Sequence, residues 1–190
     1  MSASGLIRFA RMPTVLCCLI VSALAQKTQT PLFEDYPVSE MFKGTPVPPQ
    51  IVTPEERYYR TVIRQGVSKG WGVFRDGKEQ PGPNFAGHYI GVEWGCGTGC
   101  RMMVFVDAET GKIEYPPLSF GHKGTDQTVL PMLGLGSAEI EFKANSRLLI
   151  MKTCRPGVTN LDAPRYVYHF LWQDNKWSLL RRVRLEQDEP

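Results

Sequence analysis

Residues 166–185 read YVYHFLWQDNKWSLLRRVRL, and this stretch decides the fold class. Aromatic side chains stand at every second position from Tyr166 to Trp172, which is the period of a β-strand with one buried face. Residues 173–176 supply turn-forming side chains, and residues 177–185 return as a second strand. The stretch therefore predicts an antiparallel β-hairpin.

The preceding part of the chain repeats this pattern of strand, turn and strand. Strands are predicted over the ranges 85–94, 102–107, 112–115, 138–142 and 147–153. The long segment between the third and fourth of these is rich in Gly and Pro and is predicted to be a loop with little regular structure. Since no helix is predicted between the hairpins, we expect one antiparallel β-meander sheet of about six to seven strands.

One helix is predicted before the strands. Thr53 is a good N-cap, Pro54 suits the first helical position, and Glu56 completes a capping box, so the helix should begin at residue 54 and end at Gly66 or Gly70. The predicted fold class is α+β, a single domain over residues 54–190 with this N-terminal helix packed on the sheet. Residues 26–53 are rich in proline and are predicted to form an extended lead-in.

The first 25 residues have the three parts of a secretory signal peptide. Arg8 and Arg11 form a positive n-region, residues 15–21 form a short apolar core, and residues 23–25 supply small side chains for cleavage before Gln26. The apolar core is shorter than the roughly 20 residues that span a bilayer. We expect a secreted or periplasmic protein without a transmembrane segment in the mature chain.

The charge of the chain gives no electrostatic argument for nucleic acid as a partner. The formal net charge of +3 includes Arg8 and Arg11, so the mature chain is nearly neutral. The only basic run, residues 181–184, is explained at least in part by alternation along a terminal strand. An envelope or extracellular protein is the partner class that export implies, no cofactor is expected, and the oligomeric state is left open.

Three of the five cysteines lie outside the predicted signal peptide: Cys96, Cys100 and Cys154. Export implies an oxidising compartment, where one bridge and one remaining thiol can form. We favour a Cys96–Cys100 disulfide because the two residues are close in sequence and alternate with glycines. A bridge from either of them to Cys154 remains open.

The segment from His88 to Met103 concentrates the unusual chemistry of the chain. A disulfide-closed loop is preorganised for binding, and its predicted contact residues are His88, Trp94, Gly97, Thr98, Gly99 and Arg101. The first expectation is therefore a non-enzymatic binding or envelope-structural module. No catalytic residue and no metal site are assigned in this interpretation.

Other interpretations of the same segment remain open. Reduced Cys96 and Cys100 could bind a soft metal such as copper(I), with ligands drawn from Met102, Met103, His88 and His122. A cysteine could instead be a nucleophile with His88 or His122 as its base. The glycine-rich loop could bind an anion through its amides, and a purely structural disulfide would explain the motif without any ligand.

Three motifs carry a resemblance to known proteins. The stretches PNFAGHY (83–89), WGCGTGC (94–100) and VDAETGK (106–112) resemble a group of small exported bacterial proteins for which no activity is established. The later stretch SRLLI (146–150) fits the same pattern. A more distant likeness is to periplasmic inhibitors of vertebrate-type lysozyme, which present a short cysteine-closed loop to the enzyme. Their loop carries a histidine, whereas this chain has only Gly97–Gly99 between the cysteines.

Overall fold

The computed structural model describes residues 29–69, 81–97, 100–117, 120–121, 128–129, 139–154 and 165–185. The chain divides into two compact units, Met1–Thr30 and Pro31–Pro190, and the second is described below. The predicted signal peptide, Thr98, Gly99 and His122 lie outside the described residues. None of the described helices is long and apolar enough to cross a membrane.

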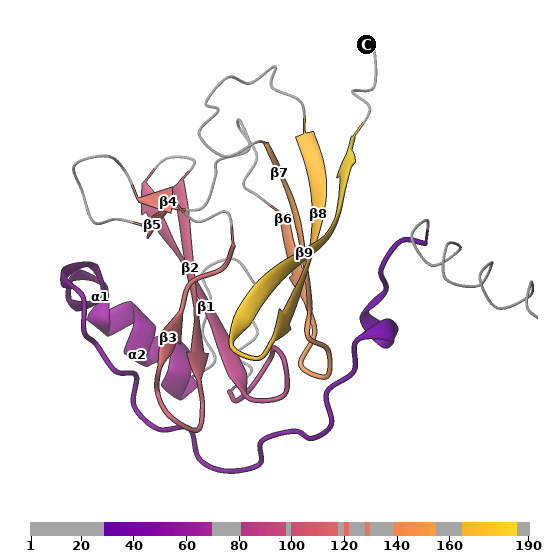
Figure 1. The fold of residues 1–190 in the computed structure, drawn as a ribbon. Coiled ribbons are helices and arrows are strands. Elements are labelled where there is room, and N and C mark those ends of the chain that lie inside the picture. The colour runs from indigo at the N-terminus through magenta and orange to yellow at the C-terminus, as the bar shows by residue number, and fades with distance from the viewer. Residues whose placement is uncertain are drawn as a thin grey trace, which may run out of the picture. The chain divides into compact units, whose positions relative to one another are not determined.

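The described strands form three antiparallel sheets, which Figure 1 shows. The first has the order β1 (Tyr89–Gly97), β2 (Cys100–Asp107) and β3 (Ile113–Glu114). A small second sheet pairs β4 (Phe120–Gly121) with β5 (Thr128–Val129). The third has the order β6 (Glu139–Phe142), β7 (Leu148–Cys154), β8 (Arg165–Gln173) and β9 (Lys176–Arg184).

The α+β class is confirmed, but the prediction of a single meander of six to seven strands is wrong. The hairpins form as predicted, yet β3 and β6 belong to different sheets. Alternation within a strand specifies its buried face and its hairpin partner, but it does not specify whether two hairpins share a ladder or stack face to face. Here they stack.

Both faces of the three-stranded sheet are buried. Side chains alternate along β1 and β2, so successive residues pack against different layers. One face packs against the four-stranded sheet, in a core that includes Tyr89, Phe105, Leu149 and Trp172. The other face packs against the helix and the lead-in, in a core that includes Ile63, Ile90, Trp94 and Met102. The result is a helix layer, a three-stranded sheet and a four-stranded sheet (Figure 1).

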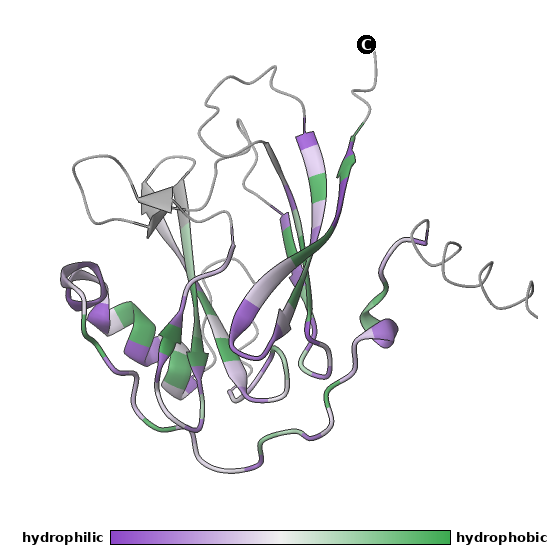
Figure 2. Ribbon diagram, viewed as in Figure 1, coloured by the Kyte–Doolittle hydropathy of each residue, from purple (hydrophilic) through white to green (hydrophobic). Residues whose placement is uncertain are grey.

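The predicted helix begins as expected, but it is interrupted at Tyr59. Thr53 Oγ1 accepts a hydrogen bond from the Glu56 N–H at 3.1 Å, which confirms the capping box of α1 (Pro54–Tyr58). The chain continues as α2 (Arg60–Lys69), so Gly66 lies inside the helix and does not end it. A Cβ atom at Gly66 would overlap with Val92, which shows how closely α2 approaches β1. Hydrophobic and hydrophilic residues alternate along the helices in Figure 2, as expected of elements with one buried face.

The lead-in crosses, as a strap, the turns at one end of the three-stranded and four-stranded sheets. Its first turn is η3 (Phe33–Asp35). It then forms backbone hydrogen bonds with the β6–β7 turn, the turn before β1 and the β2–β3 turn in succession. The backbone hydrogen bonds are Val38 N to Asn145 O (3.1 Å), Arg147 N to Tyr36 O (2.9 Å), Phe42 N to Gly87 O (2.9 Å), Val47 N to Ala108 O (3.0 Å) and Gln50 N to Gly111 O (2.8 Å). We use the name strap for residues 31–53 throughout.

Two positions beneath the strap require glycine, because the strap backbone approaches them too closely for a side chain. Gly87 has φ +84° and Gly111 has φ +78°, both in the left-handed region. A Cβ atom at Gly87 would lie 2.6 Å from the Glu40 carbonyl oxygen, and one at Gly111 would overlap with that of Pro48. The glycines of the PNFAGHY and VDAETGK motifs therefore serve the packing of the strap.

Candidate functional site

The β1–β2 hairpin carries the cysteine motif at its tip. Pairing runs from Tyr89 opposite Asp107 to Gly95 opposite Arg101, and it resumes with Gly97 opposite Cys100. Cys96 is thus the extra residue of a β-bulge, beside the partner of Cys100. The backbone brings both cysteines to the same end of the hairpin, and the disulfide itself stays a prediction.

The structure does not bring together all of the predicted contact residues. Gly97 and Arg101 lie near the tip, on β1 and β2 respectively. His88 lies before the other end of β1, about 30 Å from Gly97 at the usual rise of roughly 3.3 Å per residue. Its carbonyl oxygen accepts a hydrogen bond from the Ala108 N–H at 2.8 Å, and its ring lies 4.4 Å from that of Tyr89. His88 therefore belongs to the strapped end of the sheet.

Trp94 is an anchor of the hairpin and not an exposed contact residue. Its side chain is 4% exposed and lies in the core beneath the helix. The ring centroid is 5.2 Å from that of Tyr59, the residue that interrupts the helix. Its Nε1 is buried and has no hydrogen-bond partner within the described part of the chain.

The methionines considered as metal ligands lie on opposite faces of β2. Met102 packs beneath the helix and Met103 packs between the sheets, and both are buried. His88 lies at the other end of the hairpin, so these three side chains are not gathered at the tip. Among the described residues, no group of three His, Cys, Asp or Glu side chains could hold a metal ion.

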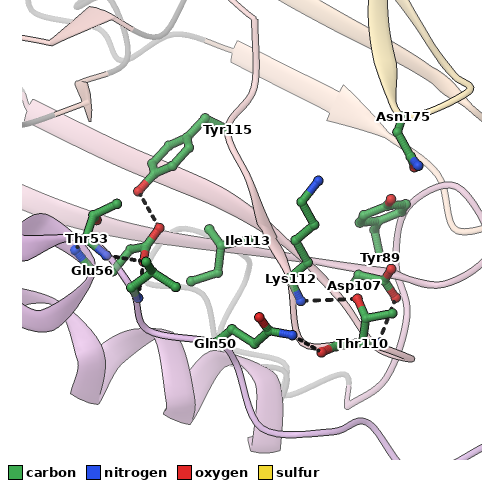
Figure 3. Close-up of a pocket in the computed structure, with 11 residues that line it drawn as sticks. Gln50, Thr53, Glu56, Tyr89, Asp107, Thr110, Lys112, Ile113, Tyr115 and Asn175 are labelled. Carbon is green, nitrogen blue, oxygen red and sulfur yellow. Dashed lines mark hydrogen bonds between the residues drawn. The ribbon is translucent and has the colours of Figure 1, made fainter.

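A cavity of about 580 Å³ lies at the strapped end, and no sequence pattern predicts it. It opens between the end of the strap, the β2–β3 turn and the β8–β9 turn (Figure 3). The lining residues come from these segments and from α1, β1, β3 and the segment after β3: Gln50, Val52, Thr53, Glu56, Tyr89, Asp107, Thr110, Lys112, Ile113, Tyr115 and Asn175. The capping box and the two turns have sequence signals, but no signal brings them to one cavity.

Glu56 and Tyr115 form one end of the cavity. One carboxylate oxygen of Glu56 accepts hydrogen bonds from the N–H groups of Val52 (2.6 Å) and Thr53 (2.8 Å). The other accepts one from the Tyr115 hydroxyl at 3.1 Å (Figure 3). Burial raises the pKa of Tyr115, and the neighbouring Glu56 carboxylate also raises it. This end ties the start of α1 to the segment after β3.

Asp107 and Lys112 form the other end, and their polar groups are also engaged. Asp107 Oδ1 accepts hydrogen bonds from the N–H groups of Glu109 (2.8 Å) and Thr110 (3.4 Å), which shapes the β2–β3 turn. Lys112 pairs with Glu114, and their hydrogen bond raises the lysine pKa. Burial raises the pKa of Tyr89, beside them, to about 12.

Tyr89, Lys112 and Tyr115 of the cavity are poorly suited to proton transfer near neutral pH. Both tyrosine hydroxyls and the Lys112 ammonium group have raised pKa values, so they remain protonated near neutral pH. A general acid or base works best with a pKa near the operating pH.

Comparisons of the chain with protein-family models, with curated proteins and with solved structures found no match. The resemblance described above therefore stays a prediction.

Proposed function

We propose that the chain is an exported, non-enzymatic binding protein that contacts its partner through the tip of the β1–β2 hairpin. The contact surface consists of Gly97, Thr98, Gly99 and Arg101, closed at its base by a Cys96–Cys100 disulfide. His88 and Trp94 are not part of this surface, because the first lies at the far end of β1 and the second is buried.

The observation that carries the proposal is the pairing of Gly97 with Cys100 beyond a bulge at Cys96. In this register Cys96 is next in sequence to the residue opposite Cys100, and a short bridge between the two cysteines needs such proximity. The hairpin below the tip is held on both faces, by Met102 and Trp94 beneath the helix and by Met103 between the sheets. A loop on so firm a support loses little conformational entropy when it binds.

The chemical state of the cysteines is the first test. The intact mass of protein purified from its exported compartment is measured before and after reduction and alkylation, with and without added copper. The proposal expects a chain that begins at Gln26, with one disulfide and no bound metal. Three free thiols with copper retained would contradict it and favour the soft-metal alternative.

The contact surface is tested with a defined partner and a matched variant. Vertebrate-type lysozyme is the first probe, since the distant resemblance implies it, and proteins crosslinked to the tip in the intact envelope form the second. Thr98→Arg should abolish the binding that the wild-type chain shows. Gln173→Arg, which adds the same charge at an exposed position of β8, should leave it unchanged. Equal binding by the wild type and both variants would exclude the tip as the contact.

A cysteine-dependent enzyme would respond differently. Cys96→Ser would then abolish turnover in an activity screen while the fold remained intact. In the binding proposal the same variant loses only the closure of the loop. Its effect on unfolding should be about 2 kcal/mol or less, because the closed ring is short.

A further inference from the structure

Strand β9 forms an edge of the four-stranded sheet. It pairs with β8 on one side, and no described strand pairs with its other side. Near its N-terminal end, the Trp177 indole donates a hydrogen bond to the Tyr115 carbonyl oxygen at 3.0 Å. The part from Leu179 to Arg184 continues beyond this contact along the outer side of the sheet (Figure 1).

The register identifies which backbone groups of β9 point away from β8. Leu185 N donates to Arg165 O at 2.8 Å, which places this pair at a hydrogen-bonded position of the ladder. Hydrogen-bonded and non-hydrogen-bonded pairs alternate in an antiparallel ladder. The pairs Tyr166–Arg184 and Tyr168–Arg182 are therefore non-hydrogen-bonded. The N–H and C=O groups of Arg182 and Arg184 point outward, where another strand could bond them.

The side chains beside these groups are exposed and basic. Arg182 and Arg184 are exposed and share the face of their partners Tyr168 and Tyr166. The Arg182 guanidinium lies 5.2 Å from the centroid of the Tyr166 ring on the neighbouring strand β8. Leu179 is 54% exposed on the same strand. Within the described residues no strand pairs with this side of β9, and the unpaired backbone groups of such an edge are a template for strand addition.

Charge decides which kind of strand fits. Two copies of β9 paired antiparallel about Leu180 would place Lys176 opposite Arg184, with Arg181 and Arg182 crowded near the axis. Directly opposed like charges destabilise a strand pair, so a second copy of this chain is disfavoured. Carboxylates opposite Arg182 and Arg184 would instead form ion pairs with the guanidinium groups.

We propose that the β9 edge binds an extended acidic protein segment by strand addition. The segment carries Asp or Glu at two positions separated by one residue, opposite Arg182 and Arg184, and an apolar side chain near Leu179. Backbone hydrogen bonds to the outward groups of Arg182 and Arg184 supply the affinity, and the carboxylates supply the selectivity. This surface is separate from the hairpin tip and does not depend on the function proposed above.

The test uses the full mature chain and a fluorescein-labelled twelve-residue peptide of alternating Glu and Thr with a central Val. Its control has the same sequence with N-methylated amides at alternate positions, which cannot add to a strand edge. Binding is followed by fluorescence anisotropy at low and physiological salt. The unmodified peptide should bind at least about tenfold more tightly than the N-methylated one.

Two variants of Arg182 separate strand addition from simple charge attraction. Arg182→Gln removes the charge and keeps the outward N–H, so binding should weaken severalfold and depend less on salt. Arg182→Pro also removes that N–H, which makes no bond to β8, and should weaken binding about tenfold further. Thermal unfolding checks both variants. If Arg182→Pro does not fold, Arg184→Pro and the N-methylated peptide test the same claim.

Three results would overturn the proposal. One is equal binding of the normal and N-methylated peptides, which would leave only charge attraction. Another is the absence of binding by the wild-type chain up to millimolar peptide. The third is a dimer in sedimentation that Arg182→Pro dissociates, which would assign the edge to a second copy. Thr98→Arg should not change peptide binding, so failure here and failure of the hairpin-tip proposal are distinguishable.

Discussion

At the residue scale, polar residues of the PNFAGHY and SRLLI motifs serve the fold. Asn84 illustrates this: its Oδ1 accepts a hydrogen bond from the Gly91 N–H at 2.7 Å and so fixes the entry into β1. Ser146 is 1% exposed, and its hydroxyl lies 2.8 Å from the Phe33 carbonyl oxygen. A motif of small and polar residues can therefore mark a close backbone contact or a side-chain hydrogen bond to the backbone as readily as a ligand site.

Gly111→Ala tests the contact between the strap and the β2–β3 turn. A Cβ atom there would overlap with the Pro48 carbonyl oxygen and would also occupy a left-handed backbone. We expect a loss of about 2–4 kcal/mol in the free energy of unfolding, measured in urea. Gly82→Ala is the control, because Gly82 has φ +100° but a Cβ atom there would meet no described atom within 4 Å. Equal losses in the two variants would show that the strap contact contributes nothing.

His169 should give the protein a measurable dependence of stability on pH. The side chain is 3% exposed, its buried Nδ1 has no hydrogen-bond partner within the described residues, and burial and Arg181 lower its pKa. The unfolded chain therefore binds a proton more readily than the folded chain. Stability from this group is complete above the unfolded pKa of about 6.5 and decreases as the pH falls below it.

The measurement is the free energy of unfolding at intervals between pH 8 and pH 5.5. His169→Gln should remove part of the decrease that the wild-type chain shows on acidification. Parallel curves for the two proteins across this range would contradict the assignment to His169.

At the element scale, local patterns predict the hairpins and the start of the helix, but not how these elements combine. The turn at residues 173–176 is recognisable because Asp174 and Asn175 tolerate the positive φ values of 51° and 55° that they adopt. The predicted start of the first strand is wrong, since residues 85–88 form a turn beneath the strap. Gly66 looks like a helix end in the sequence, whereas the absence of its side chain allows α2 to approach β1.

Gly66→Ala tests this close approach. Alanine alone would favour the helix by about 1 kcal/mol, but its Cβ would overlap with Val92. We expect a net loss of stability of about 1–3 kcal/mol in urea unfolding. In a double-mutant cycle with Val92→Ala, the double variant should be more stable than the sum of the single losses predicts. Strict additivity would exclude a direct clash.

At the scale of the whole molecule, the strap connects the three-stranded sheet, the four-stranded sheet and the helix. It bonds turns that belong to both sheets, and its far end continues into α1 through Thr53. Its partners are distant in sequence, so neither proline content nor hydrophobic period could have predicted them. The sequence therefore predicts an extended lead-in but not what it contacts.

Removal of the strap should destabilise the entire domain. A chain that begins at Ile51 loses the bonds from Val38, Phe42, Val47 and Gln50, and we expect a loss of several kcal/mol or failure to fold. A chain that begins at Pro31 keeps the strap and serves as the control. Urea unfolding and amide hydrogen exchange at Gly87 compare the two. Identical midpoints would show that the strap only covers a domain that is stable without it.

The strap also has a consequence for the order of events during synthesis. Phe33 leaves the ribosome early, yet the Ser146 hydroxyl that binds its carbonyl group is made 113 residues later. Closing a contact over such a separation carries a high entropic cost and slows folding. The contact between Phe33 and Ser146 thus cannot form until more than three quarters of the chain has been translated, and until then the start of the strap can still be threaded through a narrow pore.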